Sequence, residues 1–189
     1  LVKNSRAQLP ITPQAHKRAI LYSVSSVSLA ARVLGKADKA REYLAQELEK
    51  QGFSVEVYRL NPFKYLTPKG INGKKVLADI PVLEFRKKYD VVFVIADVQS
   101  FSTTNERNLH WSIPMGPEIP WYAAEKPTVS ISVANPFHLY DVPMVPVCIN
   151  TYNGSREAIR QAVEKITGKS EFKGNSPVDA FCGMWDTRL

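Results

Sequence analysis

The chain has 189 residues, of which 44% are hydrophobic and 23% charged, with a formal net charge of +7. These totals are typical of one globular domain and exclude an intrinsically disordered chain. The basic residues are scattered rather than gathered in a stripe with aromatics, which argues against nucleic-acid binding. The longest apolar runs, such as Val91 to Ala96, are far too short to span a membrane.

The first third of the chain predicts a linker, a strand and a helix. Residues 1–17 are polar with two prolines and are expected to be a linker. Arg18 to Val24 is a short apolar run typical of a buried strand. Asp38 to Gln51 is expected to be a helix, because Asp38 suits the N-cap and Gly52 suits the C-terminal end. The apolar face of this helix consists of Ala40, Tyr43, Leu44 and Leu48.

The middle of the chain predicts further strands around a short helix. Ser54 to Tyr58 alternates and is expected to be a strand. Pro81 suits the first turn of a short helix whose Val82 and Phe85 should face inward. The run Val91 to Ala96 is apolar on both faces, as expected of a central parallel strand. Two more strands are predicted at Thr128 to Val133 and at Val147 to Asn150.

A second amphipathic helix is predicted over Ser155 to Thr167, with Gly168 ending it. Its apolar positions are Ile159, Ala162, Val163 and Ile166. Strands that alternate with helices call for a parallel sheet covered on both sides. The predicted fold class is therefore α/β: a three-layer sandwich with a mostly parallel sheet of five or six strands and helices on both faces, flavodoxin-like or Rossmann-like. Residues 18–189 should form this single domain.

Ligands of such folds meet the loops that follow the carboxyl ends of the strands. These loops begin near Ser25, Asn61, Asp97, Asn135 and Thr151. Any function of the domain itself is expected at this edge of the sheet.

Common site motifs do not occur. The sequence has no G-x-G-x-x-G, P-loop, H-E-x-x-H or G-x-S-x-G. His16, His110 and His138 lack metal-ligand spacing, so structural or surface roles are favoured. Cys148 and Cys182 lie among apolar neighbours and are expected to be small buried hydrophobes. No metal and no organic cofactor is predicted.

Several short motifs, in order along the whole chain, carry a resemblance. They are LVKN and LPI before the first strand, Tyr89-Asp90 before the apolar strand, Ala134-Asn135-Pro136 after the next strand, the Tyr152 to Gly154 turn, and Ser176-Pro177-Val178 in the ending FKGNSPVDAFCGMWDTRL. Together they resemble the C-terminal sandwich domain of family 3 glycoside hydrolases. The ending is similar to that of bacterial members that act on N-acetylglucosaminides.

The resemblance implies a mechanism shared between two domains. In this family the nucleophile is an Asp on a (β/α)8 barrel, so 1–17 would be the linker from that barrel and this chain alone would be inactive. Retaining glycosidases also need a general acid/base close to the nucleophile. The resemblance implies two sources for it: a Glu from a sandwich loop in many glucosidase-type members, or a His paired with an Asp on the barrel in N-acetylglucosaminidases.

The loop from Asp97 to Pro114 separates these two patterns. The Asp-Arg pair of glucosidase-type relatives has no clean match here, and Glu106 is the one carboxylate of this loop after Asp97. One hypothesis is that Glu106 reaches the sugar site as a catalytic residue, and the preferred interpretation is a solvated Glu106 near Arg107 or Arg86. The candidate substrate-binding residues are Arg107, Asn108, His110 and Trp111.

Trp111, Trp121 and Tyr122 offer a further hypothesis, a platform on which a sugar ring could stack. The alternative, which is favoured, is that these aromatics pack between the sheet and a helix.

The sequence therefore predicts an accessory domain of a β-N-acetylhexosaminidase-type enzyme that acts on cell-wall or chitin-derived sugars. Its expected partners are the N-terminal barrel of the same protein and a carbohydrate. One alternative is a domain of a β-glucosidase or β-xylosidase that supplies the general acid/base. Another is a stand-alone binding module with no enzyme attached. A barrel-facing surface could also make the isolated domain dimerise.

Overall fold

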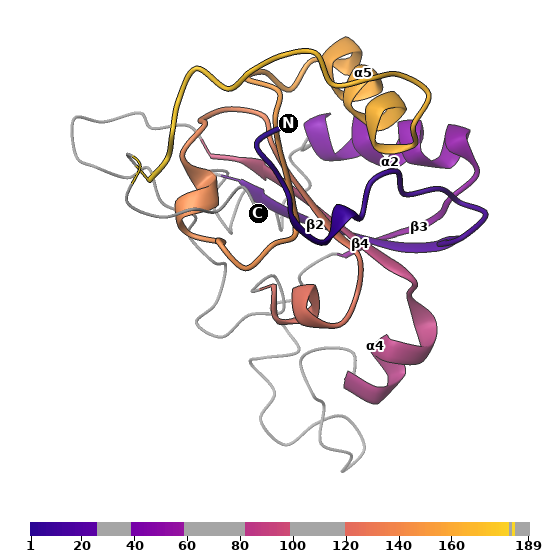
Figure 1. Cartoon of the computed structure of the whole chain (residues 1–189). Coiled ribbons are helices and arrows are strands. Elements are labelled where there is room, and N and C mark those ends of the chain that lie inside the picture. Colours follow the sequence, from indigo (N-terminus) through magenta and orange to yellow (C-terminus); the bar gives the residue numbers. More distant parts are fainter. Residues whose placement is uncertain (26–38, 59–81, 99–119, 182, 184–189) are drawn as a thin grey trace.

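A six-stranded sheet runs through the middle of the molecule in the order β1-β6-β5-β4-β2-β3 (Figure 1). The computed structural model describes residues 1–25, 39–58, 82–98, 120–181 and 183. The strands are β1 (Lys3–Asn4), β2 (Arg18–Ser25), β3 (Ser54–Val57), β4 (Val91–Asp97), β5 (Thr128–Ser132) and β6 (Val147–Asn150). Neighbouring strands are parallel except β1, which pairs antiparallel with β6. The predicted mostly parallel sheet is confirmed.

Strand β4 lies between β2 and β5, and its residues from Val91 to Ala96 are all buried. Side chains of a strand alternate between the two faces of the sheet. Phe93 and Ile95 accordingly belong to one core cluster, whereas Val92 and Val94 belong to the other. The prediction that this apolar run forms a central parallel strand is confirmed.

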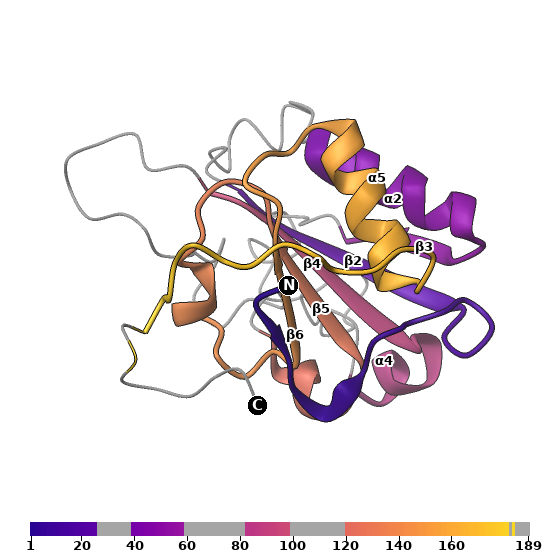
Figure 2. The ribbon, with the colours of Figure 1, turned by 45° about the horizontal axis from the view of Figure 1, so that its top comes forward.

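Helical elements cover both faces of the sheet. Helices α2 (Lys39–Gln51) and α5 (Arg156–Ile166) lie side by side over one face (Figures 1 and 2). The opposite core receives Phe85, Tyr122 and Leu139. These residues come from α4 (Val82–Lys88) and the single-turn helices η2 (Trp121–Ala124) and η3 (His138–Tyr140). The predicted three-layer α/β sandwich is therefore confirmed.

The described helix ends carry the capping residues that the sequence predicted. The Ser155 hydroxyl accepts a hydrogen bond from the backbone N–H of Ala158 at 3.3 Å and caps the N-terminus of α5. Gly52 has φ +102° and Gly168 has φ +80°, left-handed values that follow α2 and α5. Asp38, the expected N-cap of α2, lies outside the described residues.

The strand order places a topological switch point between β2 and β4. The five parallel strands, β2 to β6 in chain order, are arranged in space as β3-β2-β4-β5-β6. This is the 2-1-3-4-5 order of flavodoxin-like folds, in which ligands bind outside the carboxyl ends of the first and third strands. Those two strands here are β2 and β4.

The expectation for Val82 was wrong. Phe85 is 2% exposed as predicted, but Val82 is 44% exposed. Helix α4 has only seven residues, and Phe85 is the residue that it buries, against the rings of Tyr89, Trp121 and Tyr122. With a single buried position, the first turn stays at the surface.

The segment 1–17 contributes to the domain in two ways that the sequence did not predict. Lys3 and Asn4 pair with Cys148 and Val147 and extend the sheet by one strand. Ile11 is fully buried in the core under α2 and α5, and its backbone N–H donates to the carbonyl of Ile166 at 2.8 Å. The role of this segment as a linker from another domain stays a prediction.

An ion pair lies at the amino edge of the sheet, opposite the carboxyl ends of the parallel strands. Arg18 donates through Nε to Asp90 Oδ2 at 3.0 Å and through Nη2 to Asp90 Oδ1 at 2.6 Å. The Arg18 backbone N–H also donates to Asp90 Oδ2 at 2.9 Å. The hydrogen bonds from Arg18 lower the pKa of Asp90 to about 2. The pair thereby joins the start of β2 to the start of β4.

We expect Asp90→Asn to lower the free energy of unfolding by about 1 kcal/mol, because Arg18 is half-exposed and solvent screens the pair. The pKa of Asp90 is depressed in the folded state, so its stabilisation is complete above pH 4 and is lost as the pH falls toward 2. Urea unfolding across this pH range should show that loss in the wild type and not in Asp90→Asn. An equal acid dependence in both would contradict the assignment.

Candidate functional site

The switch point brings the ends of β2 and β4 together. Ser25 and Asp97 are register partners in these two strands, and both are partly buried. Of the five residues that end the parallel strands, Asp97 alone is acidic. The loops that continue from both strands lie outside the described residues. The switch point therefore presents one carboxylate at the edge where ligands of this fold bind.

A buried polar cluster lies next to the switch point, at the ends of β5 and β6. The Ser132 hydroxyl donates to the Asn135 carbonyl at 2.5 Å and lies 2.8 Å from His138 Nδ1. Asn150, the register partner of Ser132, donates through Nδ2 to the Pro136 carbonyl at 3.2 Å. These bonds fix the turn between β5 and η3 against the end of β6.

His138 is 1% exposed, and its burial lowers the pKa to about 4, against a smaller opposite effect of the Val98 backbone. The imidazole is therefore neutral at ordinary pH. Its Nε2 is buried without a hydrogen-bond partner within the described ranges. A side chain so enclosed cannot touch a sugar, so His138 holds the edge of the sheet together. The expected structural role of this histidine is consistent with its position.

The turn after β6 presents an aromatic side chain. Tyr152 has φ +61°, a left-handed value that is uncommon for a non-glycine residue, and is 45% exposed. The Thr151 hydroxyl donates to the Asn153 carbonyl at 2.9 Å and supports this conformation. A Cβ atom on Gly154 would lie 3.2 Å from the Ala40 Cβ, so the turn packs closely against α2. Tyr152 is thus held just beyond the carboxyl end of β6.

A cavity of about 210 Å³ adjoins this turn, and a second cavity of about 280 Å³ shares Asn175 and Ser176 with the first. The first lies between the end of β6, α5 and residues 172–176, and Asn150, Thr151 and Tyr152 contribute to its wall. The second lies between η3 and residues 175–181. Both are lined by Leu1 and Val2. The two cavities thus lie beside the polar edge of the sheet, next to Leu1, Val2 and residues 172–181.

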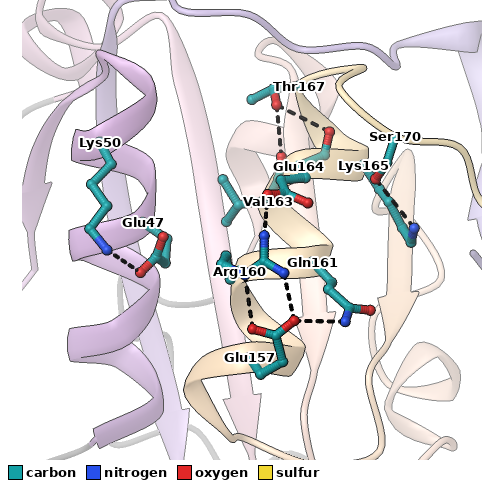
Figure 3. A network of polar contacts seen from close by, with 10 residues as sticks. All are labelled: Glu47, Lys50, Glu157, Arg160, Gln161, Val163, Glu164, Lys165, Thr167 and Ser170. Carbon is teal, nitrogen blue, oxygen red and sulfur yellow. Dashed lines mark hydrogen bonds and ion pairs between the residues drawn. The ribbon is translucent and has the colours of Figure 1, made fainter.

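Arg160 on α5 lies in a network of ion pairs and hydrogen bonds with neighbouring side chains of the same helix (Figure 3). Arg160 donates to Glu157 through Nε at 2.9 Å and through Nη2 at 2.6 Å, and it also bonds Glu164. Gln161 donates to the same Glu157 at 2.9 Å. The carboxylates of Glu157 and Glu164 thus neutralise Arg160, whereas Lys165 donates to the Ser170 hydroxyl and the Glu171 carbonyl.

The candidate residues predicted from the sequence lie outside the described ranges. They are Glu106, Arg107, Asn108, His110 and Trp111. Of the proposed stacking platform, Trp111 is likewise outside. Tyr122 is fully buried and stacks on Tyr22 at 5.2 Å between ring centroids, so it belongs to the core. Trp121 packs against Phe85 and is 38% exposed. Packing between sheet and helix thus accounts for Tyr122.

Within residues 1–25, 39–58, 82–98, 120–181 and 183, no group of three His, Cys, Asp or Glu side chains is placed to hold a metal ion. In the same part of the chain, no helix has the length and apolar character needed to cross a bilayer.

Comparison with known proteins decides the family. No model of a protein family matches the chain. It is 33% identical over its full length to the β-N-acetylglucosaminidase/β-glucosidase of Cellulomonas fimi. It superposes on the β-glucoside phosphorylase BglX with a TM-score of 0.71 and 30% identity over 100% of the chain. A family 3 β-N-acetylglucosaminidase from Paenibacillus shares the fold, with a TM-score of 0.57 and 14% identity over 94% of the chain.

The chain is a C-terminal sandwich domain of glycoside hydrolase family 3. The resemblance inferred from the sequence motifs is thereby confirmed. This family 3 domain spans 31% of the length of the Cellulomonas relative and 30% of each of the two structures. Each of these relatives therefore contains further polypeptide about twice as long as this domain.

We expect the buried His138 to make the stability of the domain depend on pH. Its folded pKa of about 4 lies below the ordinary value of 6.5, so the stabilisation is complete above pH 6.5 and is lost as the pH falls toward 4. The full loss is on the order of 3 kcal/mol. Urea unfolding at several pH values measures it.

His138→Gln should abolish this dependence between pH 6.5 and 4, whereas His16→Gln, at a partly buried position outside the cluster, should keep it. Identical pH profiles for the wild type and His138→Gln would contradict the role assigned to His138.

Proposed function

We propose that this family 3 domain belongs to an enzyme that cleaves β-N-acetylglucosaminides of cell-wall or chitin origin. The observation that carries the proposal is the 33% identity, over the whole chain, to a β-N-acetylglucosaminidase/β-glucosidase. The domain is accessory to an N-terminal barrel that carries the nucleophile, and it is inactive by itself. Its carboxyl edge, at the ends of β2 and β4, flanks the sugar site.

The chemistry of the described edge supports an accessory role. A retaining glycosidase needs two catalytic groups about 5 to 5.5 Å apart. The ends of the parallel strands contribute one carboxylate, Asp97, and the neighbouring His138 is buried and neutral. Among the described strand ends a lone carboxylate cannot perform both roles, which supports a nucleophile supplied by the barrel. In this proposal the barrel supplies both the nucleophile and the general acid/base.

Phosphorolysis is a second candidate reaction. Two structures described as the β-glucoside phosphorylase BglX match this chain at 30% and 32% identity, with TM-scores of 0.71 and 0.72. In a phosphorolytic reaction a phosphate oxygen, rather than a water oxygen, forms the new bond to the anomeric carbon. The leaving group departs with a proton from the general acid, as in hydrolysis. The two reactions thus differ only in the acceptor.

The full-length protein should release 4-nitrophenol from 4-nitrophenyl N-acetyl-β-glucosaminide, with a higher kcat/KM than on the corresponding β-glucoside. Chromatography of the products with and without inorganic phosphate identifies the acceptor. Free N-acetylglucosamine in both reactions supports hydrolysis, whereas its 1-phosphate supports phosphorolysis. A full-length protein without activity on either glycoside would overturn the proposal and favour a binding module.

Replacing Glu106 distinguishes the two sources of the general acid. If the barrel supplies it, Glu106→Gln in the full-length protein should leave kcat unchanged across the pH range, because Glu106 transfers no proton. Glu84→Gln, at an exposed position of α4, is the matched control. A fall in kcat of about 100-fold with loss of one limb of the pH profile would instead assign the acid to Glu106.

A further inference from the structure

The turn between β6 and α5 contains an asparagine followed by a glycine, Asn153 and Gly154. The other described asparagines precede residues that have a side chain, such as Asn175, which precedes Ser176. A glycine has no Cβ beside its backbone nitrogen, so a neighbouring group can approach this nitrogen closely. Asn153 is also exposed, which gives water access to its amide. This pair therefore suits a reaction in which the backbone attacks a side-chain amide.

The side chain of Asn153 folds back over the Gly154 peptide. Its Oδ1 accepts a hydrogen bond from the Ser155 backbone N–H at 3.0 Å. The ring that this bond closes contains both the Asn153 Cγ and the Gly154 nitrogen, in the manner of an Asx turn. A donor aimed at the carbonyl oxygen also stabilises the negative charge that develops there when Cγ is attacked. The bond from Ser155 therefore holds Cγ close to the Gly154 nitrogen and activates it.

A second hydrogen bond acts on the nitrogen. The Thr151 hydroxyl donates to the Asn153 carbonyl at 2.9 Å, and the Ser132 carbonyl is farther from the same hydroxyl, at 3.3 Å. The Asn153 carbonyl and the Gly154 nitrogen belong to one conjugated peptide group. A hydrogen bond to the carbonyl therefore draws electron density from the nitrogen, and the Gly154 N–H is more readily deprotonated.

The surroundings keep the two reacting groups in place. A Cβ atom on Gly154 would lie 3.2 Å from the Ala40 Cβ, so close packing against α2 both requires a glycine here and limits its movement. On the other side, the Ser155 hydroxyl is fixed by its bond to the Ala158 N–H. Groups that are held in a suitable orientation react faster than groups that move freely.

We propose that Asn153 is a site of spontaneous deamidation, in which the Gly154 nitrogen displaces ammonia from the side-chain amide. Hydroxide removes the Gly154 amide proton, and the nitrogen forms a bond to Asn153 Cγ. The bond from Cγ to the side-chain nitrogen then breaks, and ammonia leaves with a proton from water, which restores the hydroxide. The product is a cyclic succinimide, and nothing is oxidised or reduced. This reaction does not depend on the enzymatic activity of the full-length protein.

Water opens the succinimide at one of its two carbonyl groups. Attack at Cγ gives aspartate, whereas attack at the backbone carbonyl gives isoaspartate, in which the chain runs through the former side chain. The aspartate carboxylate keeps an acceptor for the Ser155 N–H, and the dipole of α5 favours its negative charge. Isoaspartate lengthens the backbone by one carbon atom and shifts Ser155 from its capping position. The two products therefore have opposite effects on the start of α5.

Peptide mapping by mass spectrometry, on full-length protein incubated in mildly alkaline buffer, measures the conversion of each asparagine. We expect Asn153 to convert at least tenfold faster than Asn175, whose neighbour has a side chain. Separate peptides distinguish Asn153 from the pair Asn72-Gly73, which lies outside the described residues. Labelling with an isoaspartyl methyltransferase, which recognises isoaspartate and not aspartate, separates the two products.

Thr151→Val, which removes the hydroxyl, should slow the conversion of Asn153 at least threefold and leave Asn175 unchanged. Thr151→Ser keeps the hydroxyl and should convert at the wild-type rate. In urea, where the turn is absent, all three proteins should convert Asn153 at equal rates. Equal rates in the folded proteins would contradict the role of Thr151. Conversion of Asn153 in urea but not in the folded protein would overturn the proposal, because the turn would then protect the amide.

Discussion

The burial of β4 between two parallel neighbours is the constraint on which the rest of the structure depends. Each residue from Val91 to Ala96 is buried, and alternate side chains enter opposite cores. Fully burying a side chain such as Val or Ile contributes about 1.5–3 kcal/mol, so this strand makes a large contribution to stability. A strand buried on both faces requires helices on both sides, and the parallel crossovers place all five parallel strand ends at one edge. The position of the candidate site follows from that arrangement.

The two edges of the sheet have different physical roles. At the amino edge, Arg18 and Asp90 join the starts of β2 and β4 with a hydrogen-bonded ion pair. At the carboxyl edge, the polar groups of Ser132 and Asn150 are bonded to the turn that leads into η3. The first edge stabilises the sheet, whereas the second supports a surface that includes Asp97 and Tyr152. The proposed accessory role of the domain depends on this second edge.

The regular parts of the fold could be predicted because their burial leaves a periodic signal. The spacing of Leu44 and Leu48 on α2, or of Ile159 and Val163 on α5, reflects one face packed on the sheet. Strand β1 could not be predicted, because two residues that pair through their backbone leave no pattern. The prediction that Val82 faces inward was wrong, because the seven-residue helix α4 buries one position, Phe85.

The sequence indicated which edge of the sheet to consider for a site, but not which residues lie together there. The rule that ligands meet the carboxyl ends of parallel strands points to the strand ends at Ser25 and Asp97, which are register partners in the sheet. That a ligand binds there stays a prediction. The cluster of Ser132, Asn135 and His138 depends on a turn that positions a histidine six residues after a serine, and spacing alone does not predict such a contact. Glu106 and its neighbours, outside the described residues, stay a prediction.

A crystal structure of the full-length protein with bound N-acetylglucosamine tests the central claim most directly. We expect a sugar between two domains, with residues at the carboxyl ends of β2 and β4 or in their following loops within contact distance. We also expect that no residue of this chain acts as the nucleophile. A sugar site without contact to any residue of this chain, or one enclosed by this chain alone, would contradict the account.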